Sequence, residues 1–470
     1  MLKILTLYSP NYIKNLVYIL QNCEYQPKSF LLWWWHQSDY RLVGARKQLA
    51  LTQKSKLLLL AGLFSALLIV LVGIILILQG YLFGILFVIL YPIFVAMILA
   101  LIVAIAWPLI VLPRQKKLIK QSEKVFAEFN GPIIAVLGSY GKTTMKELLA
   151  KLLSEKYYVA YTKGNLNVPV SHAKMASSLT GKEEILIIEY GESKPGDIEA
   201  FAKVTHPTHA FITGLAPAHL DNYKTLDAIA KDLLSIKDYV KPDNLYINSE
   251  PFKQNNFSIP KSCSYGHNFV ANWQISNYKL LPTGTSFTIK DASKNINIST
   301  KLLGKHNIGP IAAAVDLALK LGVTNLQVQN AIAKIEPHKH RMKPYYIGGA
   351  MIIDDTYNGN IEGIKAGLDL LKELPAKRKI YITPGLVEQG NLTQEIHELI
   401  GKLIAKANPN IVVLMKNSTT KYITSGLQKF NYSGEVKIQD DPLAFYNNLE
   451  HFVANGDVVL MQNDWTDNYY

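Results

Sequence analysis

The sequence predicts an α/β protein that carries a pair of apolar helices near its N-terminus. Three observations lead to this fold class. Residues 57–112 contain no Asp, Glu, Lys or Arg, which is enough apolar helix for two membrane spans at about 1.5 Å per residue. From about Val125 the chain alternates short apolar runs with helical patterns, as a parallel sheet requires. A glycine-rich turn joins the first of these runs to a helix.

The 470 residues are long enough for about three domains of ordinary size. We expect a membrane-surface segment, a transmembrane helical hairpin, a phosphate-loop α/β ATPase domain with a small antiparallel patch, and a smaller Rossmann-like α/β domain. Their predicted limits are, in order, 1–56, 57–112, 125–335 and 336–470. Within the hairpin, the spans are predicted at 57–78 and 82–112, with a turn at Gln79-Gly80 and a possible kink at Pro92.

Basic residues beside the apolar block predict its orientation. They are Arg46, Lys47, Lys54 and Lys56 before it, and Arg114, Lys116, Lys117 and Lys120 after it. Positive charge at both ends of an even number of spans places both ends in the cytoplasm. We therefore expect a multi-pass protein of the cytoplasmic (inner) membrane, with its catalytic domains facing the cytoplasm and the lipid bilayer as a partner. Trp33-Trp34-Trp35 would suit a headgroup-level anchor or a packed protein interior.

The net charge of +13 raises nucleic acid as an alternative partner. The membrane flanks and a later basic linker account for this charge, and aromatic residues are not interleaved with basic ones as in single-strand binders. We expect no nucleic-acid partner. The two cysteines, Cys23 and Cys263, lie far apart and have no metal or redox spacing, which indicates a reducing compartment.

The run Ile133–Leu137 reads as a buried strand and leads into Gly138-Ser139-Tyr140-Gly141-Lys142-Thr143-Thr144. A helical pattern follows, which is the context that a phosphate loop needs. The glycines would let backbone N–H groups close on phosphate oxygens, Lys142 would bridge the outer phosphates, and the Thr143 hydroxyl would bind Mg²⁺. The loop is a shorter variant of the full pattern, because Val136 stands where a further glycine is usual. An ordinary turn with a surface lysine is the alternative.

Two further groups are expected at the same edge of the sheet. Glu189 ends the strand pattern 185–188, and His219 follows the strand pattern 210–212. Ligands of open α/β sheets bind off the carboxyl ends of strands, so Lys142, Glu189 and His219 can converge. A carboxylate and an imidazole beside a triphosphate are plausible Mg²⁺ ligands, although each residue alone could be an ordinary loop residue.

The rest of the chain predicts the antiparallel patch and the second α/β unit. Residues 262–303 form short alternating stretches with turn residues, and a helical run from Ile311 to Leu321 follows. A basic linker then precedes a second series of strand patterns, at 352–353, 380–382, 411–414 and 458–460. Two α/β units joined by such a hinge suggest a cleft that closes on its substrate.

With these motifs in hand, the chain resembles the Mur ligase family, the ATP-dependent amino-acid and peptide ligases of peptidoglycan synthesis. The resemblance runs from about Ile133 to Asp457 and is carried by the motifs GSYGKTT, IEYG, TGLAPAHL, GKHN and DDTYN, in the family's order. It is greatest to the members that add D-alanyl-D-alanine to a UDP-linked muramoyl-tripeptide. The resemblance implies a two-domain α/β ligase that uses ATP and Mg²⁺ and activates a carboxylate as an acyl phosphate for attack by an amine.

The resemblance also implies roles for individual residues. Lys142 and Thr143 would take the phosphate and metal roles, with Glu189 and His219 as metal ligands and Lys231 as a carbamylated lysine that helps to hold a second metal. An alternative alignment puts Leu233 at that last position. The implied contacts of nucleotide and amine are Gly138, Ser139, Gly141, Lys142, Thr143, Thr144, Asn307, Arg341, Asp355, Tyr357 and Asn358.

Two departures from the family bear on the substrate. The family's N-terminal domain, which binds the UDP end of the precursor, has no counterpart in residues 1–120, and an acceptor-side loop is shortened to Gly164–Pro169. We therefore expect a membrane-anchored amide ligase that joins an amino acid or dipeptide to a soluble or lipid-linked cell-wall precursor. The alternatives are a ligase of the same fold with another acceptor, such as a polyglutamate or an amidated cell-wall peptide, and a nucleotide-binding membrane scaffold without catalysis.

Overall fold

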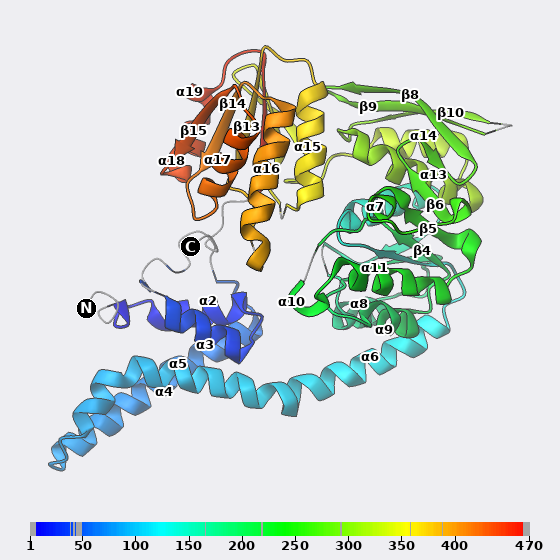
Figure 1. The fold of residues 1–470 in the computed structure, drawn as a ribbon. Helices are drawn as coiled ribbons and strands as arrows, with labels where there is room; N and C mark the ends of the chain where they lie inside the picture. The colour runs from blue at the N-terminus through cyan, green and yellow to red at the C-terminus, as the bar shows by residue number, and fades with distance from the viewer. Residues whose placement is uncertain are drawn as a thin grey trace. The chain divides into compact units, whose positions relative to one another are not determined.

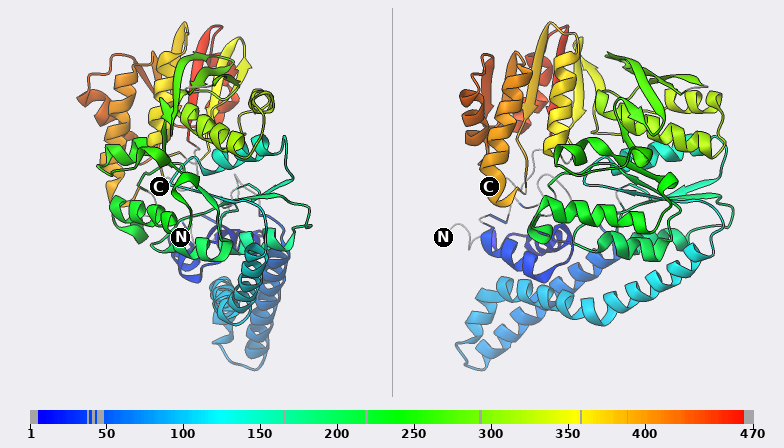
Figure 2. Two further views of the ribbon diagram at one scale, coloured as in Figure 1. Left: turned by 90° about the vertical axis from the view of Figure 1, so that its right-hand side faces the viewer. Right: turned by 45° about the vertical axis from the view of Figure 1, so that its right-hand side comes forward.

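The computed structural model describes residues 6–37, 39–40, 43, 49–164, 166–217, 220–291, 294–357, 359–387 and 389–463. The chain divides into two compact units, Met1–Leu118 and Ile119–Tyr470. Figures 1 and 2 show the helices of the first unit in blue, and the two sheets of the second unit between cyan and red. The predicted limits 125–335 and 336–470 stay a prediction, since the compact units divide the chain only at Leu118.

The described part of the first unit is helical. It contains α2 (Tyr12–Asn22), α3 (Pro27–His36), α4 (Gln53–Leu78) and α5 (Gly84–Ala106). A shared apolar core joins these helices, and Trp34 belongs to it. The Trp34 indole donates a hydrogen bond to the Tyr12 hydroxyl over 2.9 Å, and that hydroxyl donates to the Pro92 carbonyl over 3.1 Å. The middle tryptophan of the predicted anchor is therefore packed in protein, whereas Trp35 is exposed.

Helices α4 and α5 match the two predicted spans in position. The two helices pack so closely that a Cβ on Gly84 would lie 2.5 Å from the Gly73 carbonyl oxygen. Helix α5 runs through Pro92, and the helical irregularity comes later, in the π-helical turn η1 (Trp107–Val111) before α6 (Leu112–Ala127). Within the described residues, two helical stretches are long and apolar enough to cross a membrane by length and composition alone, Gln53–Leu78 and Gly84–Ala127.

The second unit contains a 10-stranded sheet whose parallel half has the order β2-β3-β1-β4-β5-β6. The strands are β1 (Ile133–Leu137), β2 (Val159–Tyr161), β3 (Ile185–Glu189), β4 (His209–Ile212), β5 (Leu245–Asn248) and β6 (Ser264–Gly266). Strand β1 lies between β3 and β4, and Val136 is paired in register with Glu189 on one side and Phe211 on the other. The three predicted strands are confirmed, and their carboxyl ends lie at one level of the sheet.

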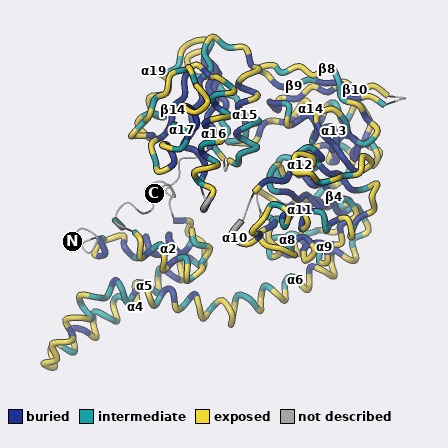
Figure 3. Tube along the Cα trace, in the orientation of Figure 1, coloured by how far each residue is buried: buried dark blue, intermediate teal, exposed yellow. Residues whose placement is uncertain are grey.

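Helices cover both faces of this sheet. They are α7 (Lys142–Leu153), α8 (Pro169–Ser177), α9 (Asp197–Thr205), α10 (Leu220–Tyr223), α11 (Leu226–Leu234), α12 (Ser249–Gln254), α13 (Ile308–Lys320) and α14 (Asn325–Ala333). Each face of the sheet packs against its own apolar core. One core contains residues of α7, α13 and α14, and the core on the opposite face contains residues of α9 and α11. The alternation places Ile134 and Val136 in the first core, and Ala135 and Leu137 in the second. In Figure 3 the buried residues of these strands are dark blue, as are the buried residues of the helices that cover them.

The predicted antiparallel patch is confirmed, and it extends the same sheet. Strands β7 (Phe269–Val270), β8 (Trp273–Leu281), β9 (Gly284–Lys290) and β10 (Asn295–Thr300) follow β6 in antiparallel pairs. Apolar residues of β9 and β10 join the core formed by α13 and α14. The patch thus closes the side of the domain on which the phosphate-loop helix lies.

The C-terminal part forms a 6-stranded sheet of order β11-β12-β16-β13-β14-β15. Its strands are β11 (Lys343–Ile347), β12 (Ala350–Asp355), β13 (Arg378–Thr383), β14 (Ile411–Met415), β15 (Glu435–Gln439) and β16 (Asp457–Gln462). All pairs are parallel except β11 with β12. The helices are α15 (Ile361–Glu373), α16 (Thr393–Ala407), α17 (Thr420–Lys429), α18 (Pro442–Asn447) and α19 (Leu449–Phe452). Two apolar cores, one on each face, confirm the predicted second α/β unit.

Candidate active site

The turn between β1 and α7 has the backbone geometry of a phosphate-binding loop. Gly138 and Gly141 have φ angles of 133° and 78°, in the region that favours glycine. A Cβ on Gly138 would lie 2.6 Å from Thr213 Oγ1 and 2.8 Å from the Gly214 nitrogen, so a side chain does not fit there. Helix α7 begins at Lys142, and the unpaired N–H groups of its first turn favour an anion.

Ser139 gives this loop a hydroxyl that suits a phosphate group. Its Oγ is buried and has no hydrogen-bond partner among the residues that the structure describes. A buried polar atom without a partner costs about 1–3 kcal/mol, and a phosphate oxygen would supply the acceptor. Gly141 and Thr144 line a large cleft beside the loop. These features fit a nucleotide phosphate and agree with the predicted loop.

Lys142 is held by a carboxylate that the sequence did not single out. Its Nζ lies 3.0 Å from Glu192 Oε2, and the side chains are 15% and 2% exposed. The ammonium also donates to the Gly138 carbonyl. The lysine that would bridge the nucleotide phosphates is therefore already paired with an anion of the protein. This anion, Glu192, lies three residues after the end of β3.

Glu189, the last residue of β3, joins the phosphate-loop helix to the loop after β2. Its carboxylate accepts hydrogen bonds from Lys146 Nζ over 2.8 Å and from Thr143 Oγ1 over 3.1 Å. Asn167 Nδ2 makes a longer contact with Oε1, at 3.4 Å. The carboxylate is almost fully buried, and its position next to Thr143 agrees with the prediction that both residues face one site.

The backbone of Glu189 is fixed as firmly as its side chain. Its N–H donates to Thr162 Oγ1 over 3.0 Å, and its carbonyl accepts from His172 Nε2 over 2.8 Å. Burial lowers the pKa of His172 to about 4. The imidazole is therefore neutral at pH 7, and it orients the end of the strand without adding a charge beside the carboxylate.

The pair Thr143 and Glu189 has the chemistry that Mg²⁺ requires. The ion prefers oxygen ligands, needs few of them from protein, and keeps several waters. A hydroxyl and a carboxylate oxygen 3.1 Å apart fit such a site. The described residues contain no group of three or more His, Cys, Asp and Glu side chains that could hold a metal, so a third protein ligand would have to come from elsewhere. His219, the predicted one, lies outside the described residues.

The structure does not bring Lys231 to this cluster. Its side chain is exposed on α11, whereas the neighbouring Asp232 and Leu233 are buried. Asp232 accepts hydrogen bonds from the Gly196 N–H over 2.7 Å and from the Tyr223 hydroxyl over 2.7 Å. The buried acidic group of α11 therefore fixes the start of α9 and a tyrosine, and the lysine beside it is exposed.

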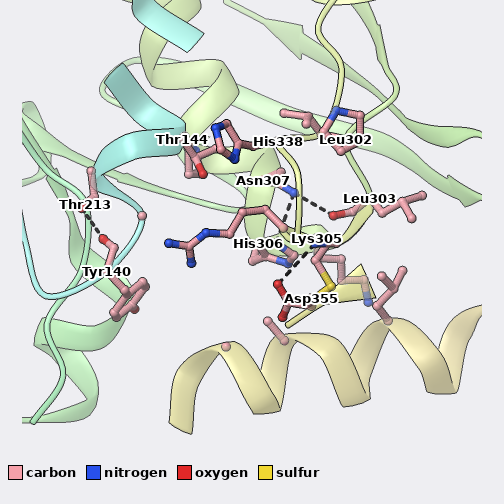
Figure 4. Close-up of a pocket in the computed structure, with 18 of the residues that line it drawn as sticks. Tyr140, Thr144, Thr213, Leu302, Leu303, Lys305, His306, Asn307, His338 and Asp355 are labelled. Carbon is pink, nitrogen blue, oxygen red and sulfur yellow. Dashed lines mark hydrogen bonds between the residues drawn. The ribbon is translucent and has the colours of Figure 1, made fainter. Parts of the chain in front are cut away.

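Six of the residues predicted to contact the nucleotide or the amine line a cleft of about 1300 Å³, namely Gly141, Thr144, Asn307, Arg341, Asp355 and Tyr357. The cleft is lined by both α/β parts of the second unit, with Tyr140 and Asn307 from one part and Asp355 from the other (Figure 4). Asn307 donates to the Leu303 carbonyl over 2.7 Å, and the Arg341 guanidinium lies 4.4 Å from the centre of the Tyr357 ring. Among the described residues, the other predicted contacts (Gly138, Ser139, Lys142 and Thr143) belong to the phosphate loop and do not line the cleft, and Asn358 lies outside the described residues.

Asp355 is the acidic group of the cleft whose proton affinity departs most from the ordinary value. Burial raises its pKa to about 6, against hydrogen bonds and charge from Gln462, Arg341 and Met342 that act in the opposite direction. The carboxylate accepts from Gln462 Nε2 over 2.8 Å and from the Met342 N–H over 3.2 Å. The Asp355 carboxyl therefore gains or loses its proton close to physiological pH. Its hydrogen bond with the Met342 N–H links it to the segment that joins the two α/β parts.

The stability of the protein should depend on this carboxyl. Between about pH 4 and pH 6 the unfolded chain has lost the proton while folded Asp355 still holds it. The folded state binds more protons in this window, so the free energy of unfolding falls as the pH rises. We expect Asp355→Asn to flatten this slope in denaturant unfolding measured from pH 4 to pH 7. Asp243→Asn, at an exposed position, should keep the slope, and an equal slope in all three proteins would contradict the prediction.

Two residues of the site, Lys146 and Glu192, were missed in the sequence. Lys146 follows Lys142 by one helical turn and shares a stripe with Leu149 and Leu153, both of which are buried. A lysine on an apolar stripe was a signal that it has a buried partner. Glu192 carried no comparable signal, because it follows Glu189 in a loop whose path depends on the fold.

Comparison with known proteins finds a family match within the second unit. The Mur ligase middle domain matches residues 136–318, which include the phosphate loop, Glu189 and Asn307. Residues 136–318 therefore form a Mur ligase middle domain. Mur ligases are ATP-dependent ligases of peptidoglycan synthesis, so the predicted enzyme class and the use of ATP are confirmed.

The relatives agree with this assignment in sequence and fold. The UDP-N-acetylmuramoyl-tripeptide–D-alanyl-D-alanine ligase of Bacillus subtilis is 27% identical over 351 residues, 73% of this chain and 76% of the relative. The enzyme of the same name from Escherichia coli is 26% identical over 336 residues, 70% and 73% of the two chains. Among solved structures, MurF ligase from Thermotoga maritima in complex with ADP has a TM-score of 0.64 at 23% identity and covers 74% of this chain and 80% of its own. MurF from Acinetobacter baumannii has the same TM-score at 21% identity, with 74% and 77% covered.

The predicted localisation, a multi-pass protein of the inner membrane, is wrong on these comparisons. The matched relatives are soluble cytoplasmic ligases. The described residues offer only two apolar helices in support of the membrane, and length and composition alone are weak evidence. One physical reason is that such helices also occur packed against protein, and part of each helix is packed here, although most of their apolar side chains are at least partly exposed. Here Leu58 of α4, and Val95 and Leu99 of α5, lie in a core with α2 and α3.

Proposed function

We propose that this Mur ligase joins D-alanyl-D-alanine to the terminal carboxylate of a cell-wall precursor peptide. The observation that carries the proposal is the cluster of Lys142, Thr143 and Glu189 at the carboxyl ends of adjacent strands, beside a cleft lined by both α/β parts. The curated relatives that support the choice of substrates are UDP-N-acetylmuramoyl-tripeptide–D-alanyl-D-alanine ligases.

The proposed reaction has two steps. A carboxylate oxygen of the precursor attacks the γ-phosphorus of ATP, and ADP leaves. The amine nitrogen of the dipeptide then attacks the carbonyl carbon of the acyl phosphate, phosphate leaves with the bonding electron pair, and the nitrogen loses a proton. Lys142 and the N–H groups at the start of α7 hold the transferring phosphoryl group. Much of the rate comes from holding the reactants in the cleft in reacting order.

The proposed ligands of Mg²⁺ are Thr143 and Glu189, with His219 as a further candidate from its motif. A bound Mg²⁺ would supply charge stabilisation for the phosphoryl oxygens. Asn307, Arg341, Asp355 and Tyr357 would contact the nucleotide and the amine substrate from the walls of the cleft, and Asn358 is a further candidate from its motif. In this arrangement Arg341 is preoriented by the Tyr357 ring that it faces.

The acceptor is proposed to be recognised through its peptide and not through a UDP group. In the first unit, the described residues form helices and contain no sheet on which a UDP-binding α/β domain could be built. Two described residues of the loop after β2 contact the cluster around Glu189, because the Gly164 carbonyl accepts from Lys146 and Asn167 contacts the Glu189 carboxylate. A ligand at this edge of the sheet would meet that loop.

The test is phosphate release by the purified protein with ATP, Mg²⁺ and D-alanyl-D-alanine. Three acceptors would be compared: UDP-N-acetylmuramoyl-tripeptide, the same muramoyl-tripeptide without UDP, and a lipid-linked tripeptide in detergent. We expect release to require both the dipeptide and an acceptor, and removal of UDP to change the KM by less than about tenfold. Release that does not depend on the dipeptide would point to another amine. The absence of phosphate release with all three acceptors would contradict the proposal.

A further inference from the structure

Lys146 is the most completely buried charged side chain of the site, and the reaction as proposed does not use it. Its side chain is 0% exposed, and its Nζ lies 2.8 Å from Glu189 Oε2. The same ammonium donates to the carbonyl of Gly164, in the loop after β2. A lone ammonium in such a place would cost far more than an exposed one, so these two contacts hold the residue where it is.

Two ion pairs link α7 to the chain at and after the end of β3, and they differ in how far their lysines are exposed to a ligand. Lys142 pairs with Glu192 at 15% exposure of the lysine, and Lys146 pairs with Glu189 at 0% exposure. An incoming phosphate can take Lys142 from its carboxylate, because that lysine is on the phosphate loop and partly open. Lys146 has no such access, so it stays with Glu189 whatever occupies the loop.

We propose that Lys146 is a positioning residue for the divalent-cation site and the counter-cation of Glu189 when no divalent cation is bound. Its ammonium fixes the Glu189 carboxylate beside Thr143 Oγ1, which lies 3.1 Å away. The contact with Gly164 ties the loop after β2 to the same carboxylate. The inference rests on the proposed metal role of Thr143 and Glu189, and its test needs neither acceptor nor amine.

The charge balance explains why such a residue is useful. With Lys146 in place, the buried carboxylate is neutralised in the empty protein, and the site does not require a metal to fold. A divalent cation that arrives alone meets a positive charge close to its carboxylate ligand and binds weakly. A cation that arrives on a nucleotide brings negative charge with it. Lys146 therefore favours loading of the metal together with ATP over loading of the free ion.

The experiment is thermal unfolding of the full chain with increasing Mg²⁺ and no nucleotide, for the wild type and Lys146→Met. The variant leaves Glu189 buried without its cation, and we expect its Tm to fall by about 10 °C. Mg²⁺ should then replace the lost charge. We expect it to restore about half of the loss, with a half-maximal concentration about tenfold lower than in the wild type. Lys146→Arg, which keeps the charge, should respond to Mg²⁺ as the wild type does.

Two further variants separate this role from a purely structural one. Lys174→Met removes an exposed lysine of α8 and should change neither Tm nor the Mg²⁺ response. Lys146→Met/Glu189→Gln removes both charges and should fold again, because no charge is left buried alone, but it should not respond to Mg²⁺.

The outcomes are distinct. Equal Mg²⁺ responses in the wild type and in Lys146→Met would overturn the proposal, and so would a Lys146→Met protein that stays unfolded in Mg²⁺ while the double variant folds. If Lys146→Met gains the Mg²⁺ response but the wild type joins no dipeptide to any acceptor, the proposed function fails and the role of Lys146 stands. If the wild type is an active ligase and Lys146→Met shows no gain, only the role of Lys146 fails.

Discussion

Lys142→Ala is expected to lower phosphate release about 10³-fold, the upper range for loss of one preorganised charge at a transition state. The lysine is at the end of the phosphate loop, and Lys146, one helical turn further on, cannot replace it because it is fully buried against Glu189. The measurement is steady-state phosphate release under the conditions given for the proposed function. Turnover close to that of the wild type would remove Lys142 from the phosphate site.

This substitution also changes stability, and a second variant separates the two effects. Removing Lys142 leaves the buried carboxylate of Glu192 without that cation, which should cost about 1–3 kcal/mol of unfolding free energy. Lys142→Ala/Glu192→Gln leaves neither charge and should recover the stability but not the turnover. If the double variant recovered turnover as well, Lys142 would serve the fold and not the reaction.

Glu189→Ala is expected to have the largest combined effect on stability and turnover. Its partner Lys146 would remain buried without a counter-charge, and breaking a buried pair in this way costs about 3–5 kcal/mol. The carboxylate that we propose as the metal ligand is lost at the same time. We expect a lower denaturation midpoint in urea and no measurable turnover at any Mg²⁺ concentration.

Glu189→Gln is the matched control, because it keeps the shape of the side chain and an acceptor for Lys146. It should lose less stability than the alanine variant and still lose turnover, since an amide is a poor ligand for Mg²⁺ beside a buried lysine. An alanine variant that keeps both turnover and the wild-type Mg²⁺ requirement would exclude Glu189 from the metal site.

The strands and the phosphate loop could be predicted because their signals are local. The apolar run Ile133–Leu137, the glycines after it and the apolar stripe of α7 together specify a strand, a turn and a helix within a short stretch of chain. Glu189 could be placed for the same reason, since it directly follows a buried strand. Parallel pairing of that strand with β1 then brings it to the loop.

The residues that the sequence did not reveal depend on contacts between distant segments. Glu192 meets Lys142 across 50 positions of the chain, and Lys146 meets Glu189 across 43. Only the order of the strands decides that these side chains come together. The antiparallel patch was predicted, but not that β7 continues the sheet from β6, because a strand pattern does not say which edge it joins.

The pairing of Lys142 with Glu192 has a consequence for inhibitor chemistry. A compound that offers only an anion to Lys142 must break an internal ion pair and leave the displaced carboxylate buried, which weakens its binding. A zwitterionic compound, with an anion for Lys142 and a cationic group for Glu192, would keep both charges neutralised. Inhibitor design against this ion pair should therefore favour molecules that carry both charges over simple phosphate mimics.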